Sequence, residues 1–410
     1  MGWGATAKMK RIVCASATKL DARTKTADAV VYDMNAIGRS HFNYDAAVSP
    51  LEAVVRFWKY QIAEQVDTKV FAFHFDSSHL IPEERQRFLE SIRYKTVERD
   101  VFPEEVKIDG RIYRKGQEPA TTAEVKSMNR DFMPVSYARV WSSRAGKAKL
   151  WGIIAELLQE FAETLTAKNT CYIIEPPQGG RITIPNAPSS TSNWGEADQK
   201  AVALTRELTA QGLSVAVCTI DWDMIIAGVC VFPKNVHVKI ARLYQDKETK
   251  AVYYSATGAK GKLTERVYEY VYPAKIGPPS VAWWLLAIGG VDYCKGLTRF
   301  GFSANEILEM LQEHQQPNLI IRRNDRIGID LPAIFRSLRG FCVVRRKISD
   351  PVQFVEEIKA MTFCMLYFLG CGHMRPRAGP DMSTFHLDVS GCSSIEDVLR
   401  LKVSPFYHSI

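Results

Sequence analysis

Two stretches, Ala29-Val-Val-Tyr-Asp33 and Val70-Phe-Ala-Phe-His-Phe-Asp76, decide the fold class of this 410-residue chain. Each is a run of apolar, β-branched or aromatic residues that ends in a carboxylate, which is typical of a buried strand. Between them, the apolar residues of 51–64 recur at helical spacing. The segment therefore predicts a strand, a helix and a second strand.

The same design recurs further along the chain. Cys171-Tyr-Ile-Ile-Glu175 and Ser214-Val-Ala-Val-Cys-Thr-Ile-Asp221 are strand-like, and a helix is predicted between them over 196–210. Strands that alternate with helices predict an α/β fold with a mainly parallel central sheet flanked by helices. Residues 236–254 alternate polar and apolar side chains, which predicts an antiparallel hairpin at the sheet edge.

The rest of the chain divides by composition. Residues 77–150 are rich in Arg, Lys, Glu and turn formers, which indicates an insertion outside the core. Helices are predicted at 282–289 and at 303–314, where Ser303 is the expected N-cap and Glu306 the partner in a capping box. The final 90 residues contain further apolar helical stretches, so a helical C-terminal region is expected.

Composition excludes some classes of protein. The nine cysteines are odd in number and mostly lie in apolar runs, which argues against a secreted disulfide scaffold and for an intracellular, reducing compartment. No apolar stretch approaches the roughly 20 residues that cross a bilayer, so no membrane partner is expected. The 53 Lys and Arg against 45 Asp and Glu give a net charge of +8, which is compatible with nucleic-acid binding without proving it.

Seven acidic residues occupy predicted strand ends or helix starts within an apolar context. They are Asp33, Asp76, Glu196, Asp198, Asp221, Asp223 and Asp292. The carboxyl ends of parallel strands meet at one edge of a sheet, so these side chains are expected to converge. Clustered carboxylates repel by about 1 kcal/mol per pair even in water. Such oxygen ligands favour Mg²⁺ or Mn²⁺, and two such ions serve phosphodiester hydrolysis. The alternative is a set of helix caps and solvated surface acids.

Two pairs of these acids have a spacing of two. On an extended chain, Asp221 and Asp223 would face the same side. Glu196 and Asp198 would converge only at the start of a helix, where Ser192 or Asn193 is the expected cap.

In their order along the chain, these motifs resemble those of the flap-endonuclease-like structure-specific 5′ nucleases. The resemblance rests on Asp33, Phe75-Asp76, Gly195-Glu196-Ala-Asp198, Asp221-Trp-Asp223 and Asp292-Tyr-Cys294, and it covers about residues 1–320. The opening Met1-Gly-Trp-Gly-Ala-Thr-Ala-Lys8 is also similar to the start of that family, in which Gly2 lies close to DNA. The resemblance implies that the seven acids bind two Mg²⁺ or Mn²⁺ ions, directly or through water, and cut DNA near single-strand/double-strand junctions.

The resemblance also implies a division of labour along the chain. Residues 1–76 and 151–320 would form the nuclease, 77–150 an arch, and 321–410 an extension of unknown role. The segment from Gly296 to Ser303 is similar to a helix-turn-helix element that holds duplex phosphates with a monovalent ion, through Gly296, Gly301 and Ser303. Phe300 and Phe302 flank Gly301, which departs from the usual turn.

Basic residues supply the remaining candidates. A helix is predicted over 82–95, and the resemblance implies that Arg85 and Arg93 stabilise the scissile phosphate, with Arg87 and Lys95 as alternates. A solvated helix face paired with Glu84 and Glu90 is the competing interpretation. In the arch, Arg144 and Lys147 would bind a single-stranded 5′ end. Cys364, Cys371 and His373 invite a zinc interpretation, but a buried helix end is preferred because a second ligand pair at proper spacing is missing.

Three functions compete. The first is a 5′ flap endonuclease or 5′ exonuclease, expected as a monomer in the nucleus or at a site of DNA replication, with flap or junction DNA as its partner. The second is an RNA-degrading relative, as among viral proteins of the superfamily. The third is a non-catalytic nucleic-acid-binding protein on the same fold. The last 90 residues carry no motif that indicates docking on a sliding clamp.

Overall fold

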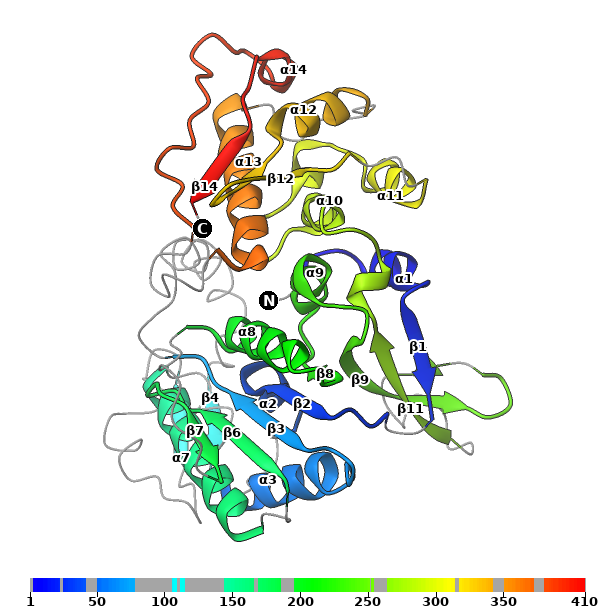
Figure 1. The fold of residues 1–410 in the computed structure, drawn as a ribbon, viewed down its shortest axis with the longest axis vertical. Coiled ribbons are helices and arrows are strands. Elements are labelled where there is room, and N and C mark those ends of the chain that lie inside the picture. Colours follow the sequence, from blue (N-terminus) through cyan, green and yellow to red (C-terminus); the bar gives the residue numbers. More distant parts are fainter. Residues whose placement is uncertain are drawn as a thin grey trace.

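The structure is a computed structural model, and it describes most of the chain. The described residues are 3–22, 25–41, 50–77, 105–108, 111–114, 144–165, 169–185, 195–250, 252–253, 264–313, 317–341, 350–371 and 380–409. A twisted sheet lies beneath a mainly helical C-terminal region in Figure 1. None of the helices in these ranges combines the length and the apolar character that a bilayer span requires.

A nine-stranded sheet forms the centre of the molecule. Its five middle strands are parallel and run in the order β9 (Val236–Asp246), β8 (Val215–Cys218), β2 (Ala29–Asp33), β3 (Val70–His74) and β6 (Cys171–Glu175). The strands at both borders are antiparallel to their neighbours. At one border, β11 (Thr264–Val271) and the short β10 (Val252–Tyr253) pair with β9, and β1 (Thr18–Asp21) pairs with β11. At the other border, β7 (Ile182–Ile184) pairs with β6. The prediction of a mainly parallel sheet flanked by helices therefore holds for its centre.

Alternating side chains place helices on both faces of this sheet. Val215 and Val217 of β8 join one core cluster, and Ala216 and Cys218 join another. The first face is covered by α8 (Ala197–Ala210), α9 (Asp223–Val231) and α10 (Val281–Gly289), with α1 (Ala7–Cys14) nearby. The second is covered by α2 (Met34–His41), α3 (Pro50–Phe57) with the π-helix Trp58–Ile62, and α7 (Arg144–Leu165). Burial on both faces explains why the middle strands are continuously apolar.

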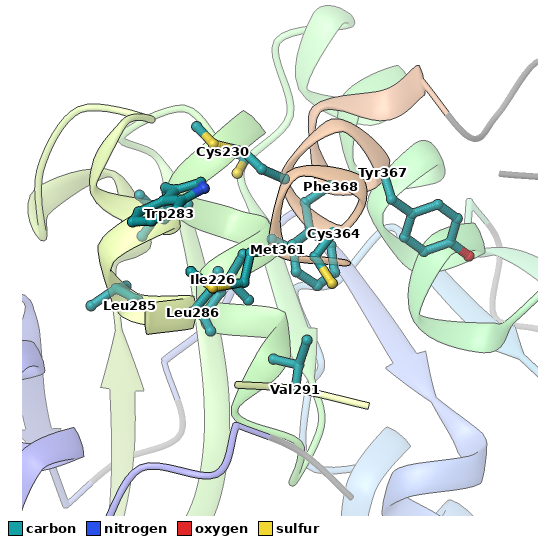
Figure 2. Close-up of a cluster of buried hydrophobic side chains, with 14 of the residues drawn as sticks. Ile226, Cys230, Trp283, Leu285, Leu286, Val291, Met361, Cys364, Tyr367 and Phe368 are labelled. Carbon is teal, nitrogen blue, oxygen red and sulfur yellow. The ribbon is translucent and has the colours of Figure 1, made fainter. Parts of the chain in front are cut away.

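The sequence predicted a helical C-terminal region, but the structure also contains strands there. It contains an antiparallel sheet of β12 (Ile320–Arg323), β13 (Arg326–Ile329) and β14 (Phe406–Ser409), with α12 (Leu331–Arg339), α13 (Pro351–Leu366) and α14 (Ile395–Arg400) around it. Figure 2 shows Met361 and Cys364 of α13 and Phe368 of the following π-helix Tyr367–Cys371 meeting Ile226 of α9 and Leu286 of α10. The two halves of the molecule therefore share one hydrophobic core.

Other predictions need correction. Residues 236–254 do contain the predicted antiparallel hairpin, formed by β9 and β10, but β9 lies inside the sheet, between β8 and β11, and not at its edge. Within 77–150, β4 (Glu105–Ile108) and β5 (Arg111–Arg114) form a hairpin, and α7 runs across the predicted boundary at 150. Short 3₁₀ turns at Pro273–Lys275 and Leu297–Phe300 and the helix α11 (Ala304–Gln312) complete the described elements.

Candidate active site

Asp33 is the centre of the acidic edge. It ends β2 and is buried, because its strand lies in the middle of the sheet. Its Oδ1 accepts a hydrogen bond from the amide of Ala36 at 3.1 Å, and its Oδ2 accepts one from the Thr219 hydroxyl at 3.0 Å. The Thr219 hydroxyl in turn accepts a bond from the amide of Asp221 at 3.0 Å. These bonds tie the end of β2 to the loop that follows β8.

Asp76 joins three elements at the same edge. It lies two residues beyond β3, and its Oδ1 accepts a hydrogen bond from the amide of Ala197, the first residue of α8, at 2.9 Å. Asn35 of α2 donates its amide Nδ2–H to Asp76 Oδ2 and accepts the backbone N–H of Asp76 at 3.1 Å. A carboxylate at a helix N-terminus is favoured by the helix dipole. Sequence reasoning missed Asn35, since nothing in its neighbourhood predicts this distant contact.

Glu196 and Asp198 stand at the start of α8, where the sequence placed them. Glu196 is itself the N-cap residue, which corrects the expected cap at Ser192 or Asn193; both of those lie outside the described residues. Glu196 is buried, and the hydroxyl of Tyr293 donates a hydrogen bond to its Oε2. The carboxylate therefore connects α8 to the turn that carries Asp292.

The spacing of Asp221 and Asp223 suggested that they face the same side of an extended chain, but the structure places neither on a strand. Strand β8 ends at Cys218, Trp222 is the N-cap of α9, and Asp223 is the first residue of that helix. Asp223 Oδ1 accepts a hydrogen bond from the amide of Met224 at 2.9 Å. A loop followed by a helix start, rather than period-two alternation, brings the two acids together.

Asp292 is buried in the turn Val291–Cys294, which follows α10. The preceding Gly290 has a φ of 66° and accepts a hydrogen bond from the amide of Gly4 at 3.0 Å. A side chain at Gly289 would lie 2.2 Å from the backbone nitrogen of Ala5, so glycine is required for this close approach. The N-terminal segment thus packs directly against the turn, and Gly2 itself lies outside the described residues.

The acids share one electrostatic environment. Burial raises the pKa of Asp33 well above its usual value, and the charges of Asp221, Asp198 and Asp76 raise it further. Burial likewise raises the pKa of Asp223, with further contributions from Asp221, Asp198 and Asp292. Four of the predicted carboxylates, Asp76, Asp198, Asp221 and Asp292, therefore repel Asp33 or Asp223 at this edge, and Glu196 adjoins Asp292 through Tyr293.

The donor set suits a hard divalent cation in kind, because carboxylate oxygens are the ligands that Mg²⁺ and Mn²⁺ prefer. As they stand, no three Asp, Glu, His or Cys side chains of the described residues form a group that could hold a metal ion. Asp33, Asp76 and Asp223 are each turned toward a backbone amide. A shared ion would require some of these carboxylates to turn toward one another, so metal binding stays a prediction.

Two lysines border the acids and were missed by sequence reasoning. Lys200 of α8 is buried and donates to the carbonyl oxygen of Phe75 at 2.8 Å; burial lowers its pKa, and the charges of Glu175 and Asp76 oppose this. The ammonium of Lys10 of α1 lies 5.4 Å from the ring centre of Trp222. Burial lowers the pKa of Lys10, and the charges of Asp223 and Asp221 oppose this shift only in part. The spacing of four between Glu196 and Lys200 was the only available signal.

The segment predicted to bind phosphates, from Gly296 to Ser303, makes hydrogen bonds within the chain. Gly296 and Gly301 have φ values of 78° and 91°, and Ser303 caps α11 by accepting the amide of Glu306. However, the amides of Lys295 and Gly296 donate to Glu357 Oε1 of α13 at 2.6 and 2.8 Å. The amide of Gly296 is therefore bonded to a buried carboxylate of the chain, and phosphate binding through backbone carbonyls and a monovalent ion stays a prediction.

Several predicted residues receive no structural description. Gly2, Arg85, Arg87, Arg93 and Lys95 lie outside the described residues. Arg144 and Lys147 lie in the first turns of α7, where the structure describes the backbone and not their side chains. His373 is outside the described residues too, whereas Cys364 is buried in α13 and hydrogen-bonded to Cys294.

Comparisons with known proteins do not assign this chain to a family. No protein-family model and no curated protein matches the sequence. Among solved structures, the bacteriophage T5 flap endonuclease, in a pseudo-enzyme-product complex with DNA and metal ions, is similar over 84% of this chain and 94% of its own length, with a TM-score of 0.36 and 10% sequence identity. A likeness of this size carries no argument about activity.

Proposed function

We propose that this protein is a structure-specific nuclease that hydrolyses nucleic-acid phosphodiesters with the help of divalent metal ions. One observation carries the proposal: Asp33 and Asp223 are buried at the carboxyl edge of a parallel sheet, and the charges of Asp76, Asp198, Asp221 and Asp292 lie close enough to raise the pKa of one or the other. Such repulsion is costly unless cations offset it. Paired Mg²⁺ or Mn²⁺ ions would offset it and supply a water nucleophile and a Lewis acid for phosphodiester hydrolysis.

The chain's own residues would prepare the site. The expected ligands, bound directly or through water, are Asp33, Asp76, Glu196, Asp198, Asp221, Asp223 and Asp292. Thr219 and Asn35 hold Asp33 and Asp76 in place through their hydrogen bonds. The ammonium of Lys200 fixes the end of β3 against α8. Arg85 and Arg93 remain the proposed contacts to the scissile phosphate.

The order of the acidic motifs favours a 5′ nuclease acting on flap or junction DNA, inside the cell at a site of DNA replication. An RNA-degrading enzyme is the second candidate, because the same carboxylates serve both substrates. A labelled 5′-flap DNA and a single-stranded RNA, compared with Mg²⁺ and with product mapping, separate the two. Preferential RNA cleavage would overturn the DNA assignment.

The activity itself is tested by Asp223→Asn. The amide oxygen of Asn can still accept the Met224 N–H, so the start of α9 is kept while a metal-binding charge is lost. Cleavage of flap DNA is expected to fall at least about 100-fold while junction binding persists. Glu309→Gln, an exposed change on α11, is the matched control. Equal cleavage by both variants would overturn the assignment of the catalytic centre to the acids. Wild-type protein that binds but never cuts with Mg²⁺ or Mn²⁺ would favour the non-catalytic alternative.

A further inference from the structure

A tyrosine-lined face of the sheet lies apart from both layers of helices. Tyr268 and Tyr270 of β11 and the adjoining Tyr272 form a buried aromatic cluster of their own. On this side of the sheet, the packing of α2, α3 and α7 is confined to β2, β3, β6, β7 and β8. No described helix of that layer reaches the tyrosines, and lysine ammonium groups lie over two of the three rings.

Four ammonium groups lie over these rings. Lys239 of β9 is 4.2 Å from the ring centre of Tyr268. Lys275, Lys25 and Lys19 are 4.4, 5.1 and 5.9 Å from the ring centre of Tyr272. The last three are exposed and Lys239 is half-buried. A lysine whose stem lies on an aromatic ring keeps its charged end in water and its position fixed.

The local field on this face is positive. His237 is buried between Tyr270 and Tyr272, with ring centres 5.2 and 5.6 Å away. Burial lowers its pKa to about 4, and the charges of Lys25 and Lys239 contribute to the shift. Asp21 shares the face, since it pairs with Tyr268 across β1 and β11. Among the described residues that contact these rings or pair with them, one carboxylate accompanies four ammonium groups, which gives this set of side chains an excess of positive charge.

The lysines begin beside the acidic edge. Lys239 is in register with Cys218, and Cys218 with Tyr32, the residue immediately before Asp33. The carbonyl oxygen of Lys239 also accepts the amide of Thr219, whose side chain donates to Asp33. From there, Lys25 and Lys275 continue toward the opposite end of β9, because Tyr272 follows the pair Val271↔Val238. The positive charges therefore form a track that leads away from the acids.

We infer that Lys19, Lys25, Lys239 and Lys275 bind the sugar-phosphate backbone of a nucleic acid that extends from the acidic edge across this face. The inference rests on the proposed function, since it assigns a path to the same substrate. Ammonium groups recognise phosphates as point charges. The tyrosines are buried and cannot stack on bases. Binding by these lysines should therefore depend on the phosphate charge and not on the base sequence.

The test is the salt dependence of nucleic-acid binding in the full-length protein without divalent metal. The double variant Lys239→Gln/Lys275→Gln is compared with Lys359→Gln/Lys402→Gln, which removes the same charge from the C-terminal region. Loss of two phosphate contacts is expected to reduce the slope of log Kobs against log[salt] by about 2 and to weaken binding uniformly across sequences. Lys239→Arg/Lys275→Arg should restore the slope, because arginine keeps the charge.

The outcomes separate this inference from the proposed function. A slope that is the same in both Gln double variants overturns the lysine track, even if the protein cuts DNA. A reduced slope supports the track, even if Asp223→Asn later shows that no cleavage depends on the acids. Urea unfolding of both double variants, with equal midpoints expected, confirms that a change in slope does not come from a change in folding.

Discussion

At the scale of the residue, Glu175 is the clearest case of a charge that the fold stabilises. It ends β6 in a fully buried position, where His74 Nδ1 lies 3.0 Å from its Oε2 and Arg181 Nε donates to its Oε1 at 2.7 Å. Burial alone would raise the pKa of Glu175. The charges and hydrogen bonds of His74 and Arg181 outweigh burial and lower its pKa from 4.5 to about 2.

This shift predicts a loss of stability in acid. A carboxyl whose pKa is lowered on folding stabilises the folded state above its unfolded value near 4.5, and this contribution disappears as the pH falls toward 2. The free energy of unfolding is expected to fall by about 3 kcal/mol over that window on account of Glu175. Urea unfolding at a series of pH values measures it, and Glu175→Gln should flatten the dependence.

Glu207→Gln is the control for this prediction. Glu207 contacts the same arginine, Arg181, at 3.1 Å, but its side chain is 49% exposed. Exposed pairs contribute little, so this variant should keep the acid-dependent loss. A wild-type profile that is flat between pH 4.5 and 2 would contradict the assignment.

At the scale of the element, helix α13 holds the turn that follows Asp292. Two backbone N–H groups, of Lys295 and Gly296, share the carboxylate of Glu357. Glu357→Ala would leave both groups without this partner in a largely buried place, and an unsatisfied buried donor costs about 1–3 kcal/mol. A destabilisation of about 2–4 kcal/mol is therefore expected in urea unfolding, with reduced cleavage because Lys295 and Gly296 directly follow the turn that carries Asp292.

Glu357→Gln is the informative companion. Its side-chain oxygen occupies the same place and can still accept from Lys295 and Gly296, so it should cost clearly less than Ala. If Ala and Gln were equally mild, the turn would be held by other contacts, such as the rings of Tyr293 and Phe363, whose centres are 5.5 Å apart.

The elements also show what a sequence can and cannot predict. Strand β2 was predictable because burial on both faces makes Ala29–Asp33 continuously apolar, and α8 because its buried residues recur at helical spacing. Strand β9 was misplaced because His237 and Lys239 face the tyrosine side, which makes an interior strand alternate like an edge strand. Helix α9 was missed since its run of apolar residues, buried on nearly every side, has no period.

For the candidate site, the acids were predictable and their surroundings were not. Each acid follows a strand or starts a helix, which is a local signal. Asn35, Tyr293 and Lys200 contact the site through residues 41, 97 and 125 positions away, respectively. The periodicity of apolar residues in a sequence gives no information about contacts between residues so far apart along the chain. The carboxylate of Glu357 at Gly296 was unpredictable for the same reason.

At the scale of the whole molecule, the C-terminal region belongs to the same core as the acidic site. Phe363 of α13 is buried and packs against Tyr293, which contacts Glu196. Phe363→Ala should cost about 3–5 kcal/mol, as expected for a buried aromatic side chain. Because the core is shared, tryptophan fluorescence and DNA cleavage should be lost at the same urea concentration, shifted together relative to wild type.

The exposed Val352 of the same helix provides the control, since Val352→Ala should leave both transitions in place. Cleavage that survives at urea concentrations where the C-terminal region has already unfolded would show two independent units instead of one.

The packing of the N-terminal segment has a consequence for biosynthesis. The indole of Trp3 donates to the carbonyl oxygen of Leu285, 282 residues away, and β2 pairs with β8 across 186 residues. A growing polypeptide on the ribosome exposes its first residues long before these partners have been translated. The acidic edge can assemble only late in translation, so a nascent chain would carry no complete centre with which to attack the nucleic acids around it.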